Sequence, residues 1–256
     1  MKKTRLLVLI SVFLQSIKYF SEMGRDRYLI LVAGGSGTRM GGRLPKQFIE
    51  IRGKAVLHHT IDRFVAAVPD IRVVTVLPDT WKQAWSDYCL VHNVTCSQRL
   101  VSGGITRFHS VKIALEKVPA GALVAVHDGV RPLVSVGMIR RLFGEAEVFP
   151  AVVPVVPVVD TLKVLGRETD ASGKTVLVPL PGEKADRSRL FAAQTPQIFW
   201  SEVLKEAYTQ PYTTDFTDDA SVAESYGTDI KYPEGERYNI KLTTPDDMVV
   251  AEALMG

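Results

Sequence analysis

Short apolar runs alternate along the chain with segments whose apolar residues recur at helical spacing. Such runs predict buried strands, which we expect near residues 28–33, 71–77, 94–101, 122–127 and 151–156. The stripes between them predict helices near residues 55–68, 81–89, 108–118 and 135–148. Alternation of strand and helix is typical of βαβ units, so the sheet should be mainly parallel with right-handed connections.

Residues 160–190 break this alternation. Thr161–Leu165 and Thr175–Leu180 have strand-like sequences and flank the turn-rich segment Gly166–Lys174. This pattern indicates a hairpin that projects from the body as an arm. We therefore expect an α/β fold, a Rossmann-like, mainly parallel sheet flanked by helices, with a projecting β-arm at about residues 160–190.

The C-terminal part of the chain predicts a few more elements. Helix patterns lie near residues 201–208 and 217–226, and a short strand pattern lies at Asn239–Leu242. A last helix should begin after Thr244, which can cap it, and Asp247 occupies the capping-box position.

Residues 1–22 differ from the rest of the chain. Basic residues precede the apolar run Leu6–Leu14, which is shorter than the roughly 20 residues that span a bilayer and resembles the start of a secretory signal. No small-x-small cleavage site follows the run. We favour translation starting at Met23, with 1–22 an upstream extension and 23–256 a single domain. A flexible tail and a functional signal are the alternatives.

The distribution of charge and the cysteines narrow the function classes. The basic side chains of residues 1–22 account for the net charge of +3, so the remaining chain is neutral overall. A neutral body argues against nucleic acid as a partner, and we expect no membrane contact. Cys89 and Cys96 are too few for a disulfide scaffold and lack metal-ligand spacing, which predicts reduced thiols in a cytoplasmic protein.

A glycine-rich loop follows the first strand directly. Its residues are Ala33, Gly34, Gly35, Ser36, Gly37 and Thr38. Glycines let backbone N–H groups approach a phosphate closely. A dinucleotide fingerprint fails at Met40 and a Walker loop fails at Arg43. Arg39 and Lys46 add two cations that suit a triphosphate, although a glycine turn after a strand can also be purely structural.

A second glycine turn lies further along the chain. Gly103 and Gly104 precede a predicted helix whose first turn contains Arg107 and Ser110. Backbone N–H groups at a helix start, together with these side chains, suit an anion or the edge of a base. A plain entry turn into the helix is the alternative.

Asp128 follows a predicted strand, at the end of the strand where ligands bind in open α/β sheets. Its carboxylate is a candidate Mg²⁺ ligand because Mg²⁺ prefers carboxylate and phosphate oxygens, although a loop aspartate more often forms a turn. Lys241 lies within the predicted strand Asn239–Leu242 and by itself indicates only a solvated face.

Other chemistry-bearing residues predict structural or surface roles. The five histidines show neither a nucleophile pattern nor a metal-ligand pattern. Trp81 and Trp85 fit a core better than a stacking platform. A serine hydrolase is disfavoured because the sequence has no Gly-x-Ser-x-Gly elbow.

These features together resemble one family, the 2-C-methyl-D-erythritol 4-phosphate cytidylyltransferases of the non-mevalonate isoprenoid pathway. The matching stretches, in the family's order between about residues 28 and 255, are AGGSGTRMG with LPKQ, GGITRFHSV, HDGVRP, VPVVDTLK, DRSRLFAAQTPQIF, TDDAS and NIKLTTPDD. Ribitol 5-phosphate cytidylyltransferases share the glycine loop and QTPQ. The segments DTLK and DRSRLFAAQTPQ are more similar to the methylerythritol branch.

The resemblance implies a nucleotidyltransferase that moves a cytidylyl group from CTP to methylerythritol phosphate. The acceptor would attack the α-phosphorus in line, pyrophosphate would leave, and Mg²⁺ would be the cofactor. Arg39, Lys46 and Lys241 would stabilise the charge of the reacting phosphates. The groups that would hold the nucleotide are residues 33–38, Gly103, Gly104, Arg107 and Ser110.

The resemblance also implies how the acceptor is bound. The residues that would hold it are Asp128, which would also bind Mg²⁺, Arg131, Thr161, Arg187 and Thr195. In the family the arm is exchanged between subunits. The chain would therefore be a homodimer through its arm, and Arg187 and Thr195 would serve the partner's site.

The chain departs from the family at two places. Ile105 stands where relatives often have Ala or Asp, which leaves a backbone contact possible there but places any side-chain contact in doubt. Gly129 and Val130 stand where relatives often have two alanines, from which we expect a looser loop.

Three other functions are compatible with the pattern. They are a ribitol 5-phosphate cytidylyltransferase, a sugar-1-phosphate nucleotidyltransferase that uses another base, and a non-catalytic nucleotide-binding protein of the same fold. The presence of Arg39, Lys46, Asp128 and Lys241 together argues against the non-catalytic protein.

Overall fold

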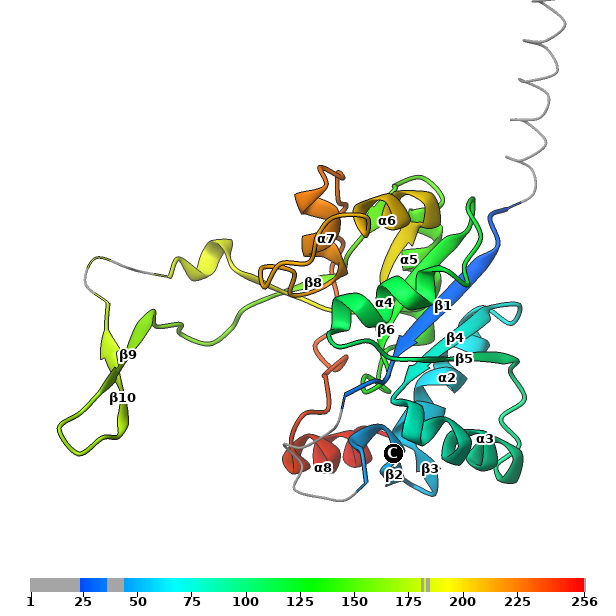
Figure 1. Ribbon diagram of the computed structural model, residues 1–256, viewed down its shortest axis with the longest axis horizontal. Coiled ribbons are helices and arrows are strands. Elements are labelled where there is room, and N and C mark those ends of the chain that lie inside the picture. Colours follow the sequence, from blue (N-terminus) through cyan, green and yellow to red (C-terminus); the bar gives the residue numbers. More distant parts are fainter. Residues whose placement is uncertain (1–23, 36–43, 181, 183–184, 256) are drawn as a thin grey trace, which may run out of the picture.

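A computed structural model gives the fold and describes residues 24–35, 44–180, 182 and 185–255 (Figure 1). Residues 1–22, for which we favour an upstream extension, lie outside the described residues. So do four predicted site residues, Ser36, Gly37, Thr38 and Arg39.

The chain forms strands and helices in alternation over its first half. The strands are β1 (Arg27–Val32), β2 (Glu50–Ile51), β3 (Lys54–Ala55), β4 (Arg72–Leu77), β5 (Gln98–Ser102), β6 (Leu123–Asp128), β7 (Ala151–Val152), β8 (Val155–Pro157), β9 (Leu165–Thr169), β10 (Thr175–Pro179), β11 (Phe191–Ala193) and β12 (Gln197–Trp200). The α-helices are α2 (Val56–Ala67), α3 (Lys82–Val91), α4 (Arg107–Leu115), α5 (Val136–Ala146), α6 (Ser201–Ala207), α7 (Asp219–Ser225) and α8 (Pro245–Leu254). Short 3₁₀ helices are η2 (Lys46–Phe48), η3 (Asp79–Trp81) and η4 (Arg187–Arg189).

The central sheet has the strand order β5-β4-β1-β6-β12-β7. β1 pairs in parallel with β4 and β6, and β4 pairs in parallel with β5. β12 runs antiparallel between β6 and β7. The expected α/β fold with a mainly parallel sheet is therefore confirmed, with an antiparallel strand inserted beside β6.

Helices cover both faces of this sheet (Figure 1). Successive strand residues point to opposite faces. Leu29 and Leu31 pack with α2, α3 and α5 on one face, whereas Ile30 packs with α4, α6 and α7 on the other. Strands buried on both faces need continuous apolar runs, which is why the strands of the first half were visible in the sequence. Trp85 is completely buried in the first of these clusters, as expected.

The arm is a hairpin of β9 and β10 that projects far from the sheet (Figure 1). The predicted first strand, Thr161–Leu165, is wrong, because the strand begins only at Leu165. The carboxylate of Asp170 accepts hydrogen bonds from the backbone N–H groups of Ser172 and Lys174. This turn places the end of β9 directly before residue 170 and thereby sets the register of the hairpin.

Several other predictions differ from the structure. The predicted strand 151–156 is split into β7 and β8, because Pro154 lies between them and has no N–H to donate. The predicted strand Asn239–Leu242 is wrong, since this segment has no regular secondary structure.

The prediction of the last helix is confirmed, with Thr244 as its N-cap and Asp247 completing a capping box.

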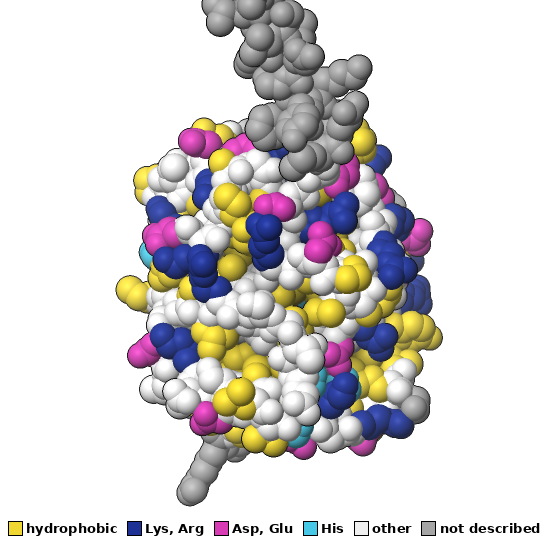
Figure 2. Space-filling model, turned by 90° about the vertical axis from the view of Figure 1, so that its right-hand side faces the viewer, with side chains coloured by type: hydrophobic (Ala, Val, Ile, Leu, Met, Phe, Trp, Pro, Cys, Tyr) yellow, Lys and Arg dark blue, Asp and Glu magenta, His cyan; other side chains and the backbone are white. Residues whose placement is uncertain are grey.

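The face in Figure 2 intersperses basic and acidic side chains. Among the residues that the structure describes, no helix combines the length and the apolar character needed to cross a membrane. In the same part of the chain, both cysteines are free thiols.

Candidate active site

A cavity of about 460 Å³ lies at the carboxyl ends of β1 and β6. The predicted site residues that line it are Ala33, Gly34, Gly35, Lys46, Gly104, Arg107, Ser110, Asp128 and Lys241. They come from the first glycine loop, from η2, from the second glycine turn with the start of α4, and from two later segments of the chain. The folding of the sheet therefore brings together most of the nucleotide-binding residues predicted from the sequence and described by the structure.

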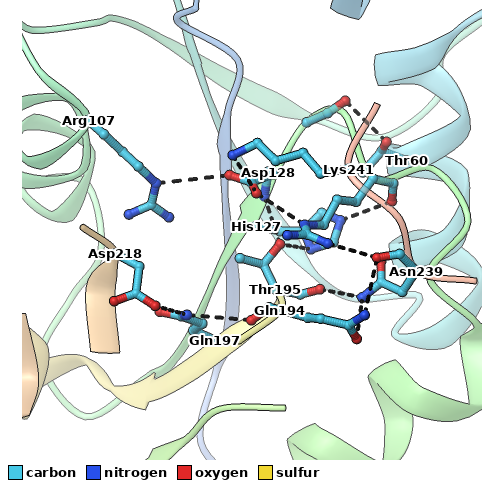
Figure 3. Close-up of polar contacts among 12 residues, drawn as sticks. Thr60, Arg107, His127, Asp128, Gln194, Thr195, Gln197, Asp218, Asn239 and Lys241 are labelled. Atoms are coloured by element: carbon cyan, nitrogen blue, oxygen red, sulfur yellow. Dashed lines mark hydrogen bonds and ion pairs between the residues drawn. The ribbon is translucent and has the colours of Figure 1, made fainter. Parts of the chain in front are cut away.

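Asp128 occupies the centre of a group of cations (Figure 3). Its Oδ2 atom lies 3.1 Å from Nε of Arg131 and 3.1 Å from Nζ of Lys241, and its Oδ1 atom lies 3.9 Å from Nε of Arg107. Burial alone would raise the pKa of Asp128, but Arg107, Lys241 and Arg131 lower the pKa well below its ordinary value. The carboxylate therefore stays ionised and organises three cations at one end of β6.

Arg107 is held from its other side by a buried carboxylate. Its Nη2 atom donates to Oδ2 of Asp219 at 2.6 Å, and Oδ1 of Asp219 accepts a hydrogen bond from the Tyr208 hydroxyl at 2.6 Å. Burial opposes the charge of Arg107, but Asp219 outweighs it and raises the pKa of the guanidinium above its ordinary value. Arg107 is therefore a fixed, permanently charged wall of the cavity.

Side-chain hydrogen bonds shape both glycine turns. Nε2 of Gln47 donates to the carbonyl oxygen of Ala33 at 2.7 Å and so fixes the start of the first loop. In the second turn, the N–H of Gly104 donates to Oγ of Ser110 at 3.0 Å. A Cβ atom at Gly104 would lie 2.5 Å from Cβ of His109, so this close approach requires glycine.

Thr195 lies beside Asp128 of its own chain. Its Oγ1 atom accepts the backbone N–H of Asp128 at 3.1 Å and lies 3.0 Å from Nδ1 of His127 (Figure 3). The expectation that Thr195 serves the partner's site is therefore wrong. The physical reason is the chain path, because the arm ends before β11 and Thr195 lies between β11 and β12, in the body.

Thr161 and Arg187 are both exposed and do not line the cavity of their own chain. They lie on the two segments that lead into and out of the arm, and Nη1 of Arg187 donates to the carbonyl oxygen of Val159 at 2.7 Å. This leaves their predicted role towards a partner's site as a prediction.

Gly129 and Ile105, two of the residues at which the sequence departs from its relatives, differ in their packing. Gly129 is tightly packed, because a Cβ atom there would lie 2.9 Å from Cδ1 of Leu57 and 3.1 Å from Cβ of Ala33. Its N–H donates to the carbonyl oxygen of Val32. The expectation of a looser loop at Gly129 is therefore wrong. Ile105 lines the cavity with a side chain that is 96% exposed.

His127 is a structural residue of the site, as the absence of a ligand pattern suggested. It is completely buried, and its Nε2 atom lies 3.2 Å from the carbonyl oxygen of Arg131, which can only accept. Nε2 therefore carries the proton, and Nδ1 accepts from the Thr195 hydroxyl. Burial lowers the pKa of His127 to about 3, in keeping with a neutral ring.

Sequence reasoning missed several residues that build the site. Gln47 and Asp219 lie in the stretches LPKQ and TDDAS, which carried the resemblance, but only their buried hydrogen bonds reveal their roles. Within the described ranges, no group of three or more His, Cys, Asp or Glu side chains is placed to hold a metal ion.

Comparison with known proteins identifies the family of this chain. The family model "IspD: 2-C-methyl-D-erythritol 4-phosphate cytidylyltransferase" matches residues 28–256. The Bacteroides thetaiotaomicron enzyme of that name is 45% identical over 227 residues, which are 89% of this chain and 98% of that protein.

Solved structures of the same family have this fold. The 4-diphosphocytidyl-2C-methyl-D-erythritol synthase of Anaerococcus prevotii superposes with a TM-score of 0.70 at 26% identity, covering 91% of this chain and 99% of that one. The 2-C-methyl-D-erythritol 4-phosphate cytidylyltransferase of Thermus thermophilus gives a TM-score of 0.66 at 30% identity, over 90% and 98%. The chain thus belongs to the 2-C-methyl-D-erythritol 4-phosphate cytidylyltransferase (IspD) family and is a nucleotidyltransferase.

Proposed function

We propose that the protein transfers the cytidylyl group of CTP to 2-C-methyl-D-erythritol 4-phosphate and releases pyrophosphate. The observation that carries this proposal is the cavity itself, which is lined by residues of both glycine turns and by Asp128 with three cations around it. Glycine turns let a nucleotide approach the backbone closely, and several cations suit two phosphorylated substrates that must approach each other.

The proposed reaction is a direct displacement. A phosphate oxygen of the acceptor attacks the α-phosphorus of CTP, the new P–O bond forms as the bond to the β-phosphate oxygen breaks, and pyrophosphate leaves with that electron pair. The work of the protein is alignment and charge stabilisation. We assign the triphosphate to Lys46, together with Arg39, and the meeting point of the two phosphates to Lys241.

Magnesium fits this site as an ion that is bound to the triphosphate of the nucleotide. Asp128 is a single carboxylate and its oxygens already face Arg131, Lys241 and Arg107, so the described residues do not make a metal site by themselves. Mg²⁺ is commonly held by one or two carboxylates and by substrate phosphates. A Mg²⁺ ion that arrives on the triphosphate would take Asp128 as a ligand and would neutralise phosphate charge.

The arm supports the proposal of a homodimer. Its apolar side chains are largely uncovered, Leu177 being 63% exposed. An isolated two-stranded hairpin is marginally stable in water, so packing against a second copy would stabilise it. In that dimer Thr161 and Arg187 would reach the acceptor in the partner's site.

The test measures pyrophosphate release from the full chain with CTP and Mg²⁺, offering methylerythritol 4-phosphate and ribitol 5-phosphate in parallel. We expect release with the methylerythritol compound only. Release with ribitol 5-phosphate only would keep the chemistry but change the acceptor, and no release with either would contradict the proposal.

A further inference from the structure

Lys241 lies on a segment without regular secondary structure, yet its ammonium is placed beside Asp128. On one side of Lys241 the segment is held by Leu242, which is buried and whose N–H donates to the carbonyl oxygen of Val130 at 2.9 Å. On the other side, an isolated parallel bridge pairs Glu234 with Val155 of β8, and no strand pairing is described between Glu234 and Lys241. Other hydrogen bonds must therefore hold the residues that lie between them.

Asn239 forms some of these hydrogen bonds. It is completely buried, and its Nδ2 atom donates to the carbonyl oxygen of Thr195 at 2.8 Å. Its own carbonyl oxygen accepts from Nη1 of Arg131 at 2.7 Å. Asn239 therefore connects the segment of Lys241 with two of the residues that surround Asp128 (Figure 3).

Gln194 anchors this arrangement. It is 6% exposed, and its Nε2 atom donates to the carbonyl oxygen of Glu236 at 2.8 Å. Its Oε1 atom accepts from the N–H of Glu236 at 3.0 Å and from Nδ2 of Asn239 at 3.4 Å. One side-chain amide thus pairs with both backbone polar groups of Glu236, as a neighbouring strand would.

Gly235 provides the space for this amide. A Cβ atom at position 235 would lie 2.5 Å from Oε1 of Gln194. The N–H of Gly235 donates to the carbonyl oxygen of Val155, which keeps its backbone in place. An alanine at position 235 would therefore displace the Gln194 side chain without removing any polar group.

We propose that Gln194 is a positioning residue, whose amide replaces a missing strand pairing and thereby sets Lys241 and Arg131 around Asp128 for the acceptor phosphate. The proposal rests on the proposed function, which places the acceptor at these cations. Displacement of a reacting group by 1 Å can cost up to about 10²-fold in rate, so the effect on catalysis should be measurable.

The first experiment compares Gln194→Met with Gln210→Met. Gln210 is a matched control, because its Nε2 atom donates to the carbonyl oxygens of Ala207 and Val222, outside the cavity. In Gln194→Met, kcat/KM for methylerythritol phosphate should fall about tenfold or more, whereas KM for CTP should change much less. Gln210→Met should leave both unchanged. Gly235→Ala should have the same effect as Gln194→Met and serves if the latter does not fold.

The second experiment needs no substrate. Limiting acetic anhydride, followed by peptide mass spectrometry, gives the acetylation rate of Lys241 relative to the exposed Lys174 of the arm. We expect a several-fold faster relative rate in Gln194→Met and Gly235→Ala, and no change in Gln210→Met. If the wild type transfers no cytidylyl group, the proposed function fails and this rate still tests the positioning. An unchanged rate in folded Gln194→Met and Gly235→Ala would overturn the inference.

Discussion

The carboxylate of Asp219, at the start of α7, accepts a 2.6 Å hydrogen bond from the guanidinium of Arg107, at the start of α4. Asp219 is completely buried, whereas a quarter of the Arg107 side chain is exposed towards the cavity. The pair therefore joins the interior of the protein to the wall of the site. It combines a structural role with an electrostatic one, and the two can be separated by measurement.

Asp219→Asn should destabilise the protein strongly. Breaking a buried ion pair costs about 3–5 kcal/mol, and the partial exposure of Arg107 favours the lower end of that range. Urea unfolding would measure the free energy of unfolding. The matched control is Asp79→Asn, which removes a carboxylate from an exposed pair with Lys82 and should leave the unfolding midpoint nearly unchanged. Equal losses in the two variants would contradict the role of burial.

Lys46→Ala should lower turnover by about 10²-fold or more, which is the scale of losing one preorganised electrostatic group. Lys46 lies in η2 and lines the cavity. The measurement is kcat for pyrophosphate release. Lys54→Ala is the control, because Lys54 is exposed, pairs with Asp62 and does not line the cavity. Turnover within twofold of the wild type in Lys46→Ala would refute its role in the transition state.

Arg187→Ala should raise KM for methylerythritol phosphate more than KM for CTP. Arg187 lies in η4 beside the arm, away from the cavity of its own chain, so its proposed contact is with the acceptor in a partner's site. Steady-state kinetics with each substrate varied in turn would measure both constants. Arg189→Ala changes an exposed neighbour in the same short helix and should affect neither. Equal increases of both constants in Arg187→Ala would argue against the arm contact.

His127 should make the protein less stable as the pH falls from 6.5 towards 3. Its pKa is about 3 in the folded chain and near 6.5 when unfolded, so in that range the unfolded state binds the extra proton. The slope from this group approaches about 1.4 kcal/mol per pH unit. Burial also lowers the pKa of His58, which adds to the slope in the same direction. The lowered pKa of Asp128 acts only near and below its ordinary value of 3.8, so the slope between pH 5 and 6.5 reports protonation of these histidines.

NMR of the imidazole resonances of His127 would check this directly. The ring should remain neutral at pH 5 in the Nε2–H form. Protonation of the folded protein with a midpoint near 6.5 would show that the prediction is wrong.

The elements predicted correctly from the sequence are those whose pattern is local. The strand of Leu29–Leu31 is apolar on both faces, and the helix after Thr244 has its cap within four residues. β12 was missed because it is four residues long and follows directly after Pro196. Lys241 was placed in a strand because its sequence has strand character, whereas a side-chain amide holds that segment.

In the site too, features with a local sequence pattern were predicted and features that depend on distant segments were not. Motifs located Asp128 and Lys46, because spacing within a loop is visible in the sequence. The groups that hold the cations Arg107 and Arg131 beside Asp128 come from distant segments, namely Asp219 for Arg107 and the carbonyl of Asn239 for Arg131. No local pattern links those positions. The roles of residues 36–39 stay predictions, because they lie outside the described residues.

The base of the arm is closed within the chain itself, since β8 and β11 pair antiparallel where the arm leaves and re-enters the body. The body can therefore form its own backbone hydrogen bonds before the hairpin associates with a second chain. If the arm assembles the dimer, folding of each chain and association of two chains should be separate steps with different dependence on protein concentration. Recovery of the intrinsic fluorescence of the three tryptophans would be first order, whereas recovery of activity would become faster with protein concentration.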